Sequence, residues 1–530
     1  MAFLEAFSLG RVVLLLAVFW ACWTLSLAIY RIYLSPLAKF PGPKLSAATY
    51  WYEFYHDCIR HGRFSWEIER MHDVYGPIVR INPDELHIRD ADWHDEIYTS
   101  STRPRNKCYF FVGRIGRGSI FGSISDEQHR LRRQALNPFF SKKSIVNIEP
   151  QIQEKVDKFC SRLLEHSGSK EPLNLGACYT ALTLDVISDY AYGQPLGLLD
   201  LSDFGSKWRE MIKMSLECMA PVRSFPWLMD VLENMPYGLA LRLNASVALM
   251  LEFQHQIRAQ IIKTLERGTN SAAANKTGQK TIFETLRDST LPPAEKKIDR
   301  LKEEGFVLTA AAADATSMTL TVLTYHLLSS SSLLSTLLTE LQTAQSDPTL
   351  PIPWQTLEQL PFFRACITEG LRISALSTSR LIRSAPYEIL RYKEWEIPED
   401  TFVSMTSHFI HMSPEYYTDP FKFDPERWLR ADADGTRHQL DKYFVPFSRG
   451  SRACIGQNLA LAELYLGIAS VVRRVPMQLF ETTRDDVKVV RDAFVGNPIE
   501  GSNGVRVVVG GGGEGDVEKE VLGNHASQDT

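Results

Sequence analysis

The sequence of 530 residues has few cysteines, and none of its eight cysteines forms a C-x-x-C pair. This scarcity excludes a zinc ribbon, a ferredoxin-type iron–sulfur cluster and a disulfide scaffold, and it is typical of a reducing compartment. The chain also lacks an excess of basic residues, because 58 lysines and arginines face 63 aspartates and glutamates, a formal net charge of −5. Without a global positive field, nucleic acid is not an expected partner.

Nucleotide-binding turns and internal repeats are missing as well. No glycine-rich turn between a strand and a helix is evident, so a dinucleotide or flavin domain is not expected in this chain. No repeat with a period of about 20–50 residues is visible. The composition is 44% hydrophobic, 11% aromatic and 23% charged, which excludes a disordered or fibrous chain.

Charge is absent from the stretch Val12 to Ile29, which lies between Arg11 and Arg31. Eighteen helical residues rise about 27 Å, close to the hydrocarbon thickness of an endoplasmic-reticulum bilayer. The stretch is longer than the core of a signal peptide, which is the alternative interpretation. We therefore expect residues 1–35 to form a single-pass anchor in that membrane. The mild positive bias downstream predicts that the body faces the cytosol.

The body is expected to be one large α-rich domain, residues 36–508, that begins with the hinge Phe40-Pro41-Gly42-Pro43. Helical periodicity is clear over 145–164, 247–265 and 457–473, and 301–331 reads as a long apolar core helix. Two β signals lie at 78–88 and 387–403, and 267–280 reads as a surface loop. Residues 509–530 are predicted to be a disordered polar tail. The fold class is thus mainly α with small β-sheets.

One cysteine lies in the coherent segment Phe447-Ser-Arg-Gly-Ser-Arg-Ala-Cys-Ile-Gly456. The glycines at 450 and 456 let the backbone bend tightly and approach a flat ligand. Backbone N–H groups at the following helix start can hold Cys454 as a thiolate. Arg452 supplies a cation for a carboxylate, and the Phe447 ring supplies a flat apolar surface. An inert buried cysteine is the alternative for any cysteine taken alone.

This segment resembles the F-x-x-G-x-R-x-C-x-G heme signature of the cytochrome P450 family. Other motifs of the family follow in the expected order over about residues 36 to 508, and the chain resembles fungal secondary-metabolism members such as the trichodiene oxygenase-like group. The resemblance implies the cytochrome P450 fold preceded by one transmembrane helix. It also implies heme b, with Cys454 as the axial thiolate ligand of the iron, a ligand that favours O–O cleavage.

Glu369-x-x-Arg372 resembles the family's E-x-x-R pair, and Arg427 lies in a segment that resembles its P-E-R-W element. The resemblance implies a buried structural triad that holds the cysteine loop. The segment His129 to Arg133 resembles W-x-x-x-R, with His in place of Trp. Arg133 would then pair with a heme propionate, and His129 would donate a hydrogen bond to it.

Arg383 matches the position of another propionate contact. Arg130 and Arg132 are read as surface residues only.

The segment Ala311 to Thr316 resembles the family's A-G-x-D/E-T-T, where an acid and an alcohol relay protons to dioxygen. Asp314 matches the acid. Ala312 replaces the glycine, and Ala315 replaces the threonine that follows the acid. Thr316 lies one residue after Ala315 and is rotated by about 100° from it around the helix. It could therefore replace the missing threonine only through a distorted turn. A substrate hydroxyl that positions water, poor coupling of oxygen, and a rearrangement without oxygen are the other possibilities, with substrate assistance favoured.

The resemblance implies a membrane-anchored monooxygenase that inserts one oxygen atom into an apolar small molecule, a terpenoid or polyketide skeleton. Electrons would come from NADPH through a separate flavin-containing NADPH–cytochrome P450 reductase. Substrate contacts are expected in 107–121, 204–239, the long apolar helix 301–331, 375–379 and 494–499. Two alternatives remain, a heme-thiolate isomerase or dehydratase and a non-catalytic heme-binding scaffold.

Overall fold

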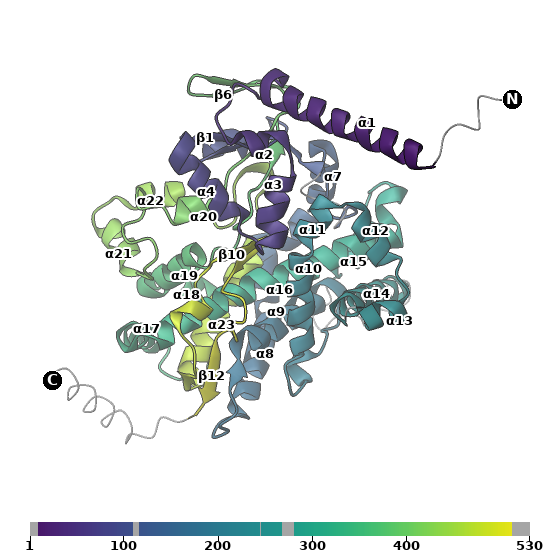
Figure 1. Cartoon of the computed structure of the whole chain (residues 1–530). Helices are drawn as coiled ribbons and strands as arrows, with labels where there is room; N and C mark the ends of the chain where they lie inside the picture. Colours follow the sequence, from purple (N-terminus) through teal and green to yellow (C-terminus); the bar gives the residue numbers. More distant parts are fainter. Residues whose placement is uncertain (1–8, 110–115, 244, 268–279, 511–530) are drawn as a thin grey trace, which may run out of the picture.

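The computed structural model describes residues 9–109, 116–243, 245–267 and 280–510. Most of the expected surface loop (267–280) and nearly all of the expected disordered tail (509–530) lie outside the described residues. The structure confirms the predicted mainly α fold with small β-sheets (Figure 1). The expected helices are present, with slightly different ends, as α8 (Lys142–Leu164), α14 (Ala245–Arg267), α16 (Ile298–Leu328) and α23 (Gln457–Arg474).

The core is a bundle in which α16 runs along α9 (Leu175–Tyr192) and also packs on α23, while α23 packs on α8. Helix α9 is apolar on nearly all sides and almost completely buried, as expected for a helix at the centre of a bundle. Hydrogen bonds of hydroxyl groups link α9 to α16. The hydroxyl oxygens of Tyr179 and Thr324 lie 2.8 Å apart, and the Thr183 hydroxyl donates to the Ala313 carbonyl at 3.3 Å. This packing fixes α16, the helix that carries Asp314.

Other helices surround the bundle (Figure 1). Those that position the site or its approaches are α3 (Trp51–Phe54), α7 (Asp126–Leu136), α10 (Ser206–Glu217), α11 (Met219–Ser224), α12 (Trp227–Glu233), α19 (Pro361–Ile373), α21 (Glu426–Ala433) and α22 (Arg437–Tyr443). α7 begins with the N-cap Ser125, whose hydroxyl accepts from the Gln128 amide.

The largest sheet has the strand order β1-β2-β8-β5-β3. Its strands are β1 (Ile78–Asn82), β2 (Glu85–Ile88), β3 (Asn106–Lys107), β5 (Arg383–Ser384) and β8 (Phe402–Ser404). β1 and β2 are antiparallel with Ile78 opposite Ile88, and β2 runs parallel to β8. β3 and β5 are antiparallel, and their register places Lys107 directly opposite Arg383.

Smaller sheets complete the fold. β6 (Leu390–Tyr392) pairs with β7 (Trp395–Ile397), and β10 (Arg491–Ala493) pairs with β11 (Val495–Asn497). A third sheet has the order β4-β12-β9, from Leu173–Asn174, Arg506–Val509 and Met477–Leu479.

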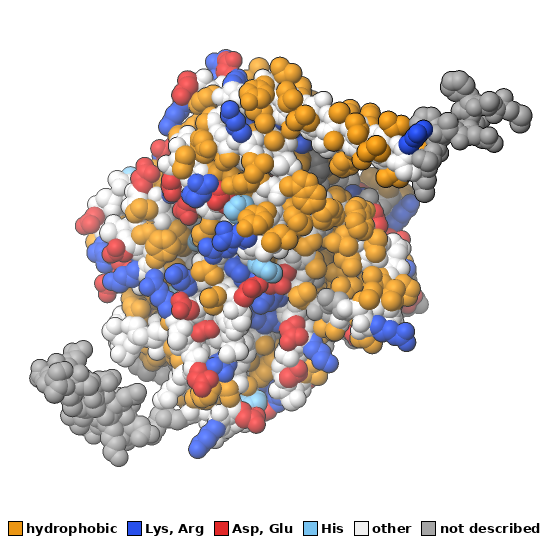
Figure 2. All heavy atoms as spheres, viewed as in Figure 1, with side chains coloured by type: hydrophobic (Ala, Val, Ile, Leu, Met, Phe, Trp, Pro, Cys, Tyr) orange, Lys and Arg blue, Asp and Glu red, His pale blue; other side chains and the backbone are white. Residues whose placement is uncertain are grey.

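The N-terminal helix α1 (Leu9–Ile29) projects along one edge of the body (Figure 1). With the π-helical turn Tyr30–Leu34 it forms an apolar stretch of 25 residues, Gly10–Leu34, which contains an 18-residue window of mean hydropathy 2.4. Hydrophobic side chains cover α1 and continue onto the adjoining face of α3, α11 and α12 (Figure 2), where Trp51 and Trp227 are exposed. By length and composition α1 is a candidate membrane span. α16 is similarly apolar but lies mostly inside the bundle.

The Pro-Gly-Pro segment that follows is fixed to the body. The Arg80 amide donates to the Pro41 carbonyl at 2.7 Å, and the Arg80 guanidinium donates to the Arg31 carbonyl at the same distance. A Cβ on Gly42 would lie 2.5 Å from the Arg80 carbonyl oxygen, so a side chain there would push the segment off β1. The expected hinge is therefore a docked connection that fixes where α1 leaves the body.

Candidate functional site

Cys454 lies at the end of the loop that precedes α23. Its backbone amide donates to the Phe447 carbonyl at 2.9 Å, which closes the loop. Burial among protein atoms raises the pKa of its thiol, while the Gly456 amide and the Arg133 guanidinium act in the opposite direction. The side chain is nevertheless exposed. A thiol that is surrounded by protein and still accessible, with an amide and a cation beside it, is suited to act as a metal ligand.

The two glycines of this loop serve different purposes. Gly450 has φ +76°, and a Cβ there would lie 2.2 Å from the Thr99 carbonyl oxygen. Its close approach is to the backbone at Tyr98 and Thr99, so a contact within the protein already requires glycine there, and the approach to a flat ligand stays a prediction. Gly456 has φ −83°, and a Cβ on it would meet only the Cys454 sulfur, at 4.0 Å. Gly456 therefore leaves space on the side of the thiol.

Helix α7 brings Arg133 to the cysteine loop. Its guanidinium donates to the Ala453 carbonyl and, at 2.8 Å, to Asn137 Oδ1. One turn earlier, His129 is buried on the same helix. Burial, together with the positive charges of Arg452 and Lys107, lowers the pKa of His129 far below its usual range. The two predicted residues of α7 therefore lie at one end of the site, among cations.

Those cations and the His129 ring form a cluster that we name the basic cluster: Lys107, His129, Arg133, Arg383 and Arg452. Arg452 donates to the backbone carbonyls of Arg105, Ser123 and Ile124 at 2.8–3.2 Å. Burial and the nearby Arg383 lower its pKa to about 9. Burial also lowers the pKa of Arg383 and, with Arg383 and Arg452 nearby, that of Lys107.

No described carboxylate forms an ion pair with any member of the basic cluster. Like charges directly opposite one another in a sheet are destabilising, yet Lys107 faces Arg383 across β3 and β5. Buried cations are normally paired. The cluster therefore fits a ligand that carries carboxylates and that brings its own negative charge to this end of the site. Sequence reasoning placed Lys107 in a substrate-contact stretch but gave it no cofactor role.

On the other side of the cysteine loop, Glu369 and Arg372 are completely buried on α19. The Arg372 guanidinium binds both carboxylate oxygens of Glu369, at 2.7 and 2.9 Å. Arg427 on α21 donates to Glu369 Oε1 at 3.2 Å, and the Trp428 indole N–H donates to Oε2 at 2.9 Å. The structure thus brings the three predicted residues together, and it adds Trp428.

The triad reaches the cysteine loop through His411. Arg372 donates to the His411 carbonyl at 2.7 Å, and the Val445 amide bonds the His411 ring at 3.0 Å. Val445 is two residues before Phe447, whose carbonyl accepts from the Cys454 amide. The Trp428 ring also packs edge-on against Phe444, with 5.4 Å between the ring centroids. The triad thus holds the residues from which the cysteine loop begins.

Helix α16 continues without a break through the segment that resembles the oxygen-binding motif. Ala311 is exposed, Ala312 and Ala315 are partly exposed, and Thr316 is only 5% exposed. The Thr319 hydroxyl donates to the Ala315 carbonyl at 3.0 Å, as in an ordinary helix. The distorted turn that would let Thr316 serve is not present in α16.

Asp314 is the acid of this segment, and its Oδ2 is buried without a hydrogen-bond partner. Burial raises the pKa of Asp314 to about 6, and Arg209 opposes the rise. Arg209 extends from α10, and burial lowers its pKa while Asp314 acts in the opposite direction. A Cβ on Gly176 would lie 1.7 Å from the Arg209 guanidinium, so only glycine leaves room for this side chain.

Arg132, which was read as a surface residue, is 4% exposed, and that prediction is wrong. It donates to Glu295 at 2.8 and 3.1 Å and to the carbonyls of Arg117 and Ser119. It therefore fixes the loop before α7 to the start of α16. Arg130 is exposed, as expected.

The chain matches the family model "Cytochrome P450" over residues 50–499. It is 42% identical to conidiogenone synthase from Penicillium rubens, over 91% of this chain and 96% of the relative. It is 39% identical to N-acetyltryptophan 6-hydroxylase from Emericella nidulans, over 93% and 96%. It is 38% identical to the cytochrome P450 monooxygenase TRI4 from Fusarium sporotrichioides, over 89% and 90%.

These matches confirm the predicted resemblance to fungal secondary-metabolism enzymes. They cover nearly the whole chain, including the cysteine loop, the triad and α16. The chain is an oxidoreductase and belongs to the cytochrome P450 family.

Proposed function

We propose that this protein is a membrane-anchored heme-thiolate monooxygenase. It inserts one oxygen atom of O2 into an apolar small molecule, a terpenoid or polyketide skeleton, in secondary-metabolite biosynthesis. The observation that carries the proposal is the accessible Cys454 thiol beside Arg133, a member of the basic cluster, which forms no ion pair with a carboxylate in the described part of the chain. An iron-bound macrocycle with two carboxylates matches both features at once.

The residues at this site fit heme b. Cys454 would be the axial ligand of the iron, and the Gly456 amide and Arg133 stabilise its thiolate form. Arg133, Arg383 and Arg452 would hold the propionates, His129 would donate a hydrogen bond to one of them, and Phe447 would pack on the macrocycle. When bound, heme with a thiolate ligand supplies the activation of dioxygen. The triad of Glu369, Arg372 and Arg427 keeps the loop in place.

On the oxygen side, the chain supplies Asp314 as the group that holds and moves protons. A carboxyl with a pKa of about 6 exchanges protons readily near neutral pH. Ala315 leaves no hydroxyl next to it, and Thr316 is buried in a regular helix. A hydroxyl or carbonyl of the substrate, together with water, therefore takes the place of the missing threonine.

The electron donor is NADPH–cytochrome P450 reductase, a separate protein that carries the flavins. Helix α1 is proposed to hold the body at the cytosolic face of the endoplasmic reticulum. Its support is the apolar stretch Gly10–Leu34 and the docking of Pro41 and Arg31 on Arg80. A tethered body shares a membrane surface with the reductase and with apolar substrates that partition into lipid.

The test is turnover of the full-length protein in vesicles with reductase, NADPH and 18O2. The substrate panel contains terpene alcohols, polyketides and indole amino acids, the last because two relatives are named tryptophan-type hydroxylases. We expect one product that contains a single 18O atom and that is lost without NADPH. Product formed without NADPH and O2 would establish the isomerase or dehydratase alternative. Heme incorporation without any product across the panel would favour the scaffold alternative.

A further inference from the structure

The segment that joins α19 to β5 is rich in hydroxyl groups. Its residues 374–379 read Ser-Ala-Leu-Ser-Thr-Ser, and no proline lies between α19 and β5. Both ends of the segment border the proposed heme site, because α19 carries two members of the triad and β5 carries Arg383 of the basic cluster. Judged by composition alone, residues 374–379, which we name the hydroxyl segment, would form a polar wall beside this site.

Two of these hydroxyl groups bond backbone carbonyls. The Ser374 hydroxyl donates to the Gly370 carbonyl at 2.6 Å, and the Ser377 hydroxyl donates to the Ser379 carbonyl at 3.2 Å. A hydroxyl group has a single hydrogen to donate. Neither Ser374 nor Ser377 therefore keeps a donor for a ligand.

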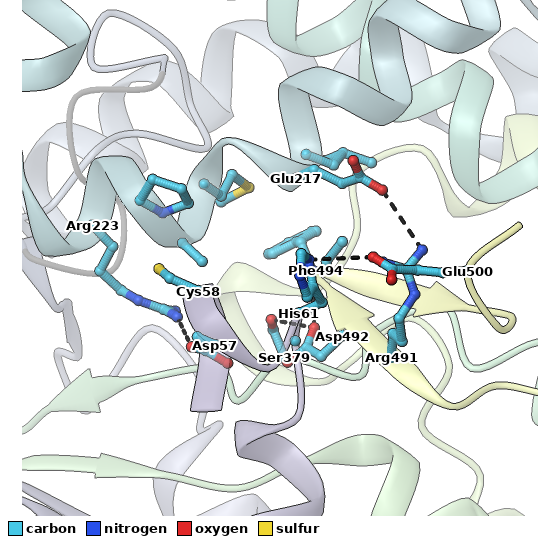
Figure 3. A pocket seen from close by; sticks show the side chains of 16 residues that line it. Asp57, Cys58, His61, Glu217, Arg223, Ser379, Arg491, Asp492, Phe494 and Glu500 are labelled. Atoms are coloured by element: carbon cyan, nitrogen blue, oxygen red, sulfur yellow. Dashed lines mark hydrogen bonds and ion pairs between the residues drawn. The ribbon is translucent and has the colours of Figure 1, made fainter. Parts of the chain in front are cut away.

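Asp492 on β10 accepts from the other two hydroxyl groups. Its Oδ1 accepts from the Thr378 hydroxyl at 2.9 Å and from the Ser379 hydroxyl at 2.7 Å. Figure 3 shows the Ser379 and Asp492 side chains close together. The same oxygen also accepts from the Phe494 amide at 2.9 Å. One carboxylate thus joins the hydroxyl segment to the β10–β11 hairpin.

Asp492 is itself held by another part of the chain. Its amide donates to the Gly62 carbonyl at 2.9 Å, and its Oδ2 accepts at 2.7 Å from the hydroxyl of Ser65 on α4 (Phe64–Tyr75). A Cβ on Gly62 would lie 2.1 Å from the Asp492 carbonyl oxygen, so the two backbones approach closely. The carboxylate is therefore placed by contacts outside the hydroxyl segment and acts on that segment as a fixed acceptor.

The accessible part of the hydroxyl segment is apolar as a result. Thr378 and Ser379 are buried, and only Leu376 and Ser377 are partly accessible. The Ser377 hydrogen is already bonded, so the Leu376 side chain is what the segment offers to a ligand. A polar sequence thus forms an apolar surface.

We propose that Asp492 is a positioning residue that makes the hydroxyl segment an apolar wall of the substrate site. The inference rests on the proposed function and deepens it. The apolar skeleton of the substrate lies against this wall, and the hydroxyl or carbonyl that takes the place of the missing threonine faces Asp314 on α16. Without Asp492 the Thr378 and Ser379 hydroxyls need other acceptors, because a buried donor without a partner is costly.

The test compares two probes that bind heme iron through an imidazole nitrogen, phenylimidazole and its para-hydroxyl analogue. Their dissociation constants are measured from the Soret shift of the full-length heme protein. We expect the parent to bind the apolar probe about tenfold more tightly than the hydroxylated one. Asp492→Ala is expected to reduce this preference about fivefold, because it releases two hydroxyls. Asp492→Asn keeps a carbonyl oxygen as acceptor and should stay within about twofold of the parent.

A second pair of substitutions separates positioning from a general loss of structure. The double variant Thr378→Val with Ser379→Ala removes the two hydroxyls and should retain the parental preference. Adding Asp492→Ala to it should change nothing further, because Asp492 acts through those hydroxyls. Ser65→Ala is the milder variant, which removes the donor to Oδ2 and should reduce the preference about twofold. Heme content and the Soret maximum verify that each variant is folded.

Asp486→Ala is the matched control. Asp486 likewise accepts from a threonine and a serine hydroxyl, those of Thr483 at 3.3 Å and Ser502 at 2.6 Å, but it belongs to the turn Arg484–Asp486. This variant should leave the preference unchanged.

Equal binding of the two probes by the parent, or an unchanged preference in Asp492→Ala, would overturn the proposed wall. So would an effect of Asp492→Ala that persists in the variant without the two hydroxyls. Absence of any Soret shift with imidazole in the unmodified protein would instead overturn the proposed function.

Discussion

The two buried acids of the site, Glu369 beside the cysteine loop and Asp314 on α16, differ in how fully they are hydrogen-bonded. On the cysteine side, Glu369 is saturated by Arg372, Arg427 and Trp428. On the oxygen side, Asp314 keeps one oxygen without a partner, and Arg209 is near enough to act on its pKa without forming an ion pair. A saturated buried acid is costly to remove because its partners are left unpaired, whereas an unsatisfied one costs stability and remains available for protons. We therefore propose that Glu369 serves the structure of the site and Asp314 its reaction.

The largest effect is expected where the saturated network is broken. Glu369→Ala leaves two buried arginines without their carboxylate, which costs about 3–5 kcal/mol of unfolding free energy. We expect little heme-loaded protein, measured as heme per protein and by thermal unfolding. Glu481→Ala is the matched control, because Glu481 and Arg484 have the same spacing but Glu481 is 69% exposed and bonds Arg506 instead. That surface change should cost less than about 1 kcal/mol.

Removing the unsatisfied acid, Asp314, should increase the free energy of unfolding instead of lowering it. Asp314→Asn is expected to reduce NADPH-dependent product formation about 100-fold, with an unchanged Soret band, because a general acid is lost. The raised pKa means that the folded state holds a proton more tightly than the unfolded state, so stability falls as pH rises from about 4 to 6. The variant should therefore be more stable than the parent at pH 8, by on the order of 1 kcal/mol. Lower stability at pH 8 would contradict this description of Asp314.

Gly176→Ala sharpens the comparison without changing any charge. The added methyl group displaces the Arg209 guanidinium, which lies 1.7 Å from that position. Since Arg209 lowers the pKa of Asp314, its displacement should raise that pKa further. The limb of the pH–rate profile on which activity falls as Asp314 loses its proton is expected to move to higher pH by about half a unit. The same variant made in the Asp314→Asn background should show no such movement.

The smallest effects are expected at the alcohols. Thr316→Ala should leave the fraction of NADPH electrons recovered in product within about twofold, because Thr316 is buried in a regular helix. Ala315→Thr should also change this fraction less than about twofold if the substrate supplies the hydroxyl. A severalfold increase in Ala315→Thr would show instead that the missing threonine limits coupling.

Features that depend on short motifs could be predicted from the sequence. The cysteine loop, the E-x-x-R pair and the regular helices follow from local spacing, and the structure places them as expected. Gly450 shows the limit, because its glycine is required by Tyr98 and Thr99, which lie some 350 residues earlier in the chain. Nothing local indicates such a contact.

Long-range side-chain partners were missed for the same reason. Arg132 reaches Glu295, Arg209 lies over Gly176, and Lys107 faces Arg383. Each partner comes from a different part of the chain and meets the other only after the bundle and the main sheet have formed. Charge alone would have classed all three as surface residues, because buried lysines and arginines are rare.

The reduced protein's difference spectrum with and without carbon monoxide tests the central claim most directly. We predict a strongly red-shifted Soret band that is lost in Cys454→Ala, because we propose that the thiolate of that residue would bind the heme iron. A band typical of histidine-ligated heme, or a red-shifted band that survives in Cys454→Ala, would contradict the account.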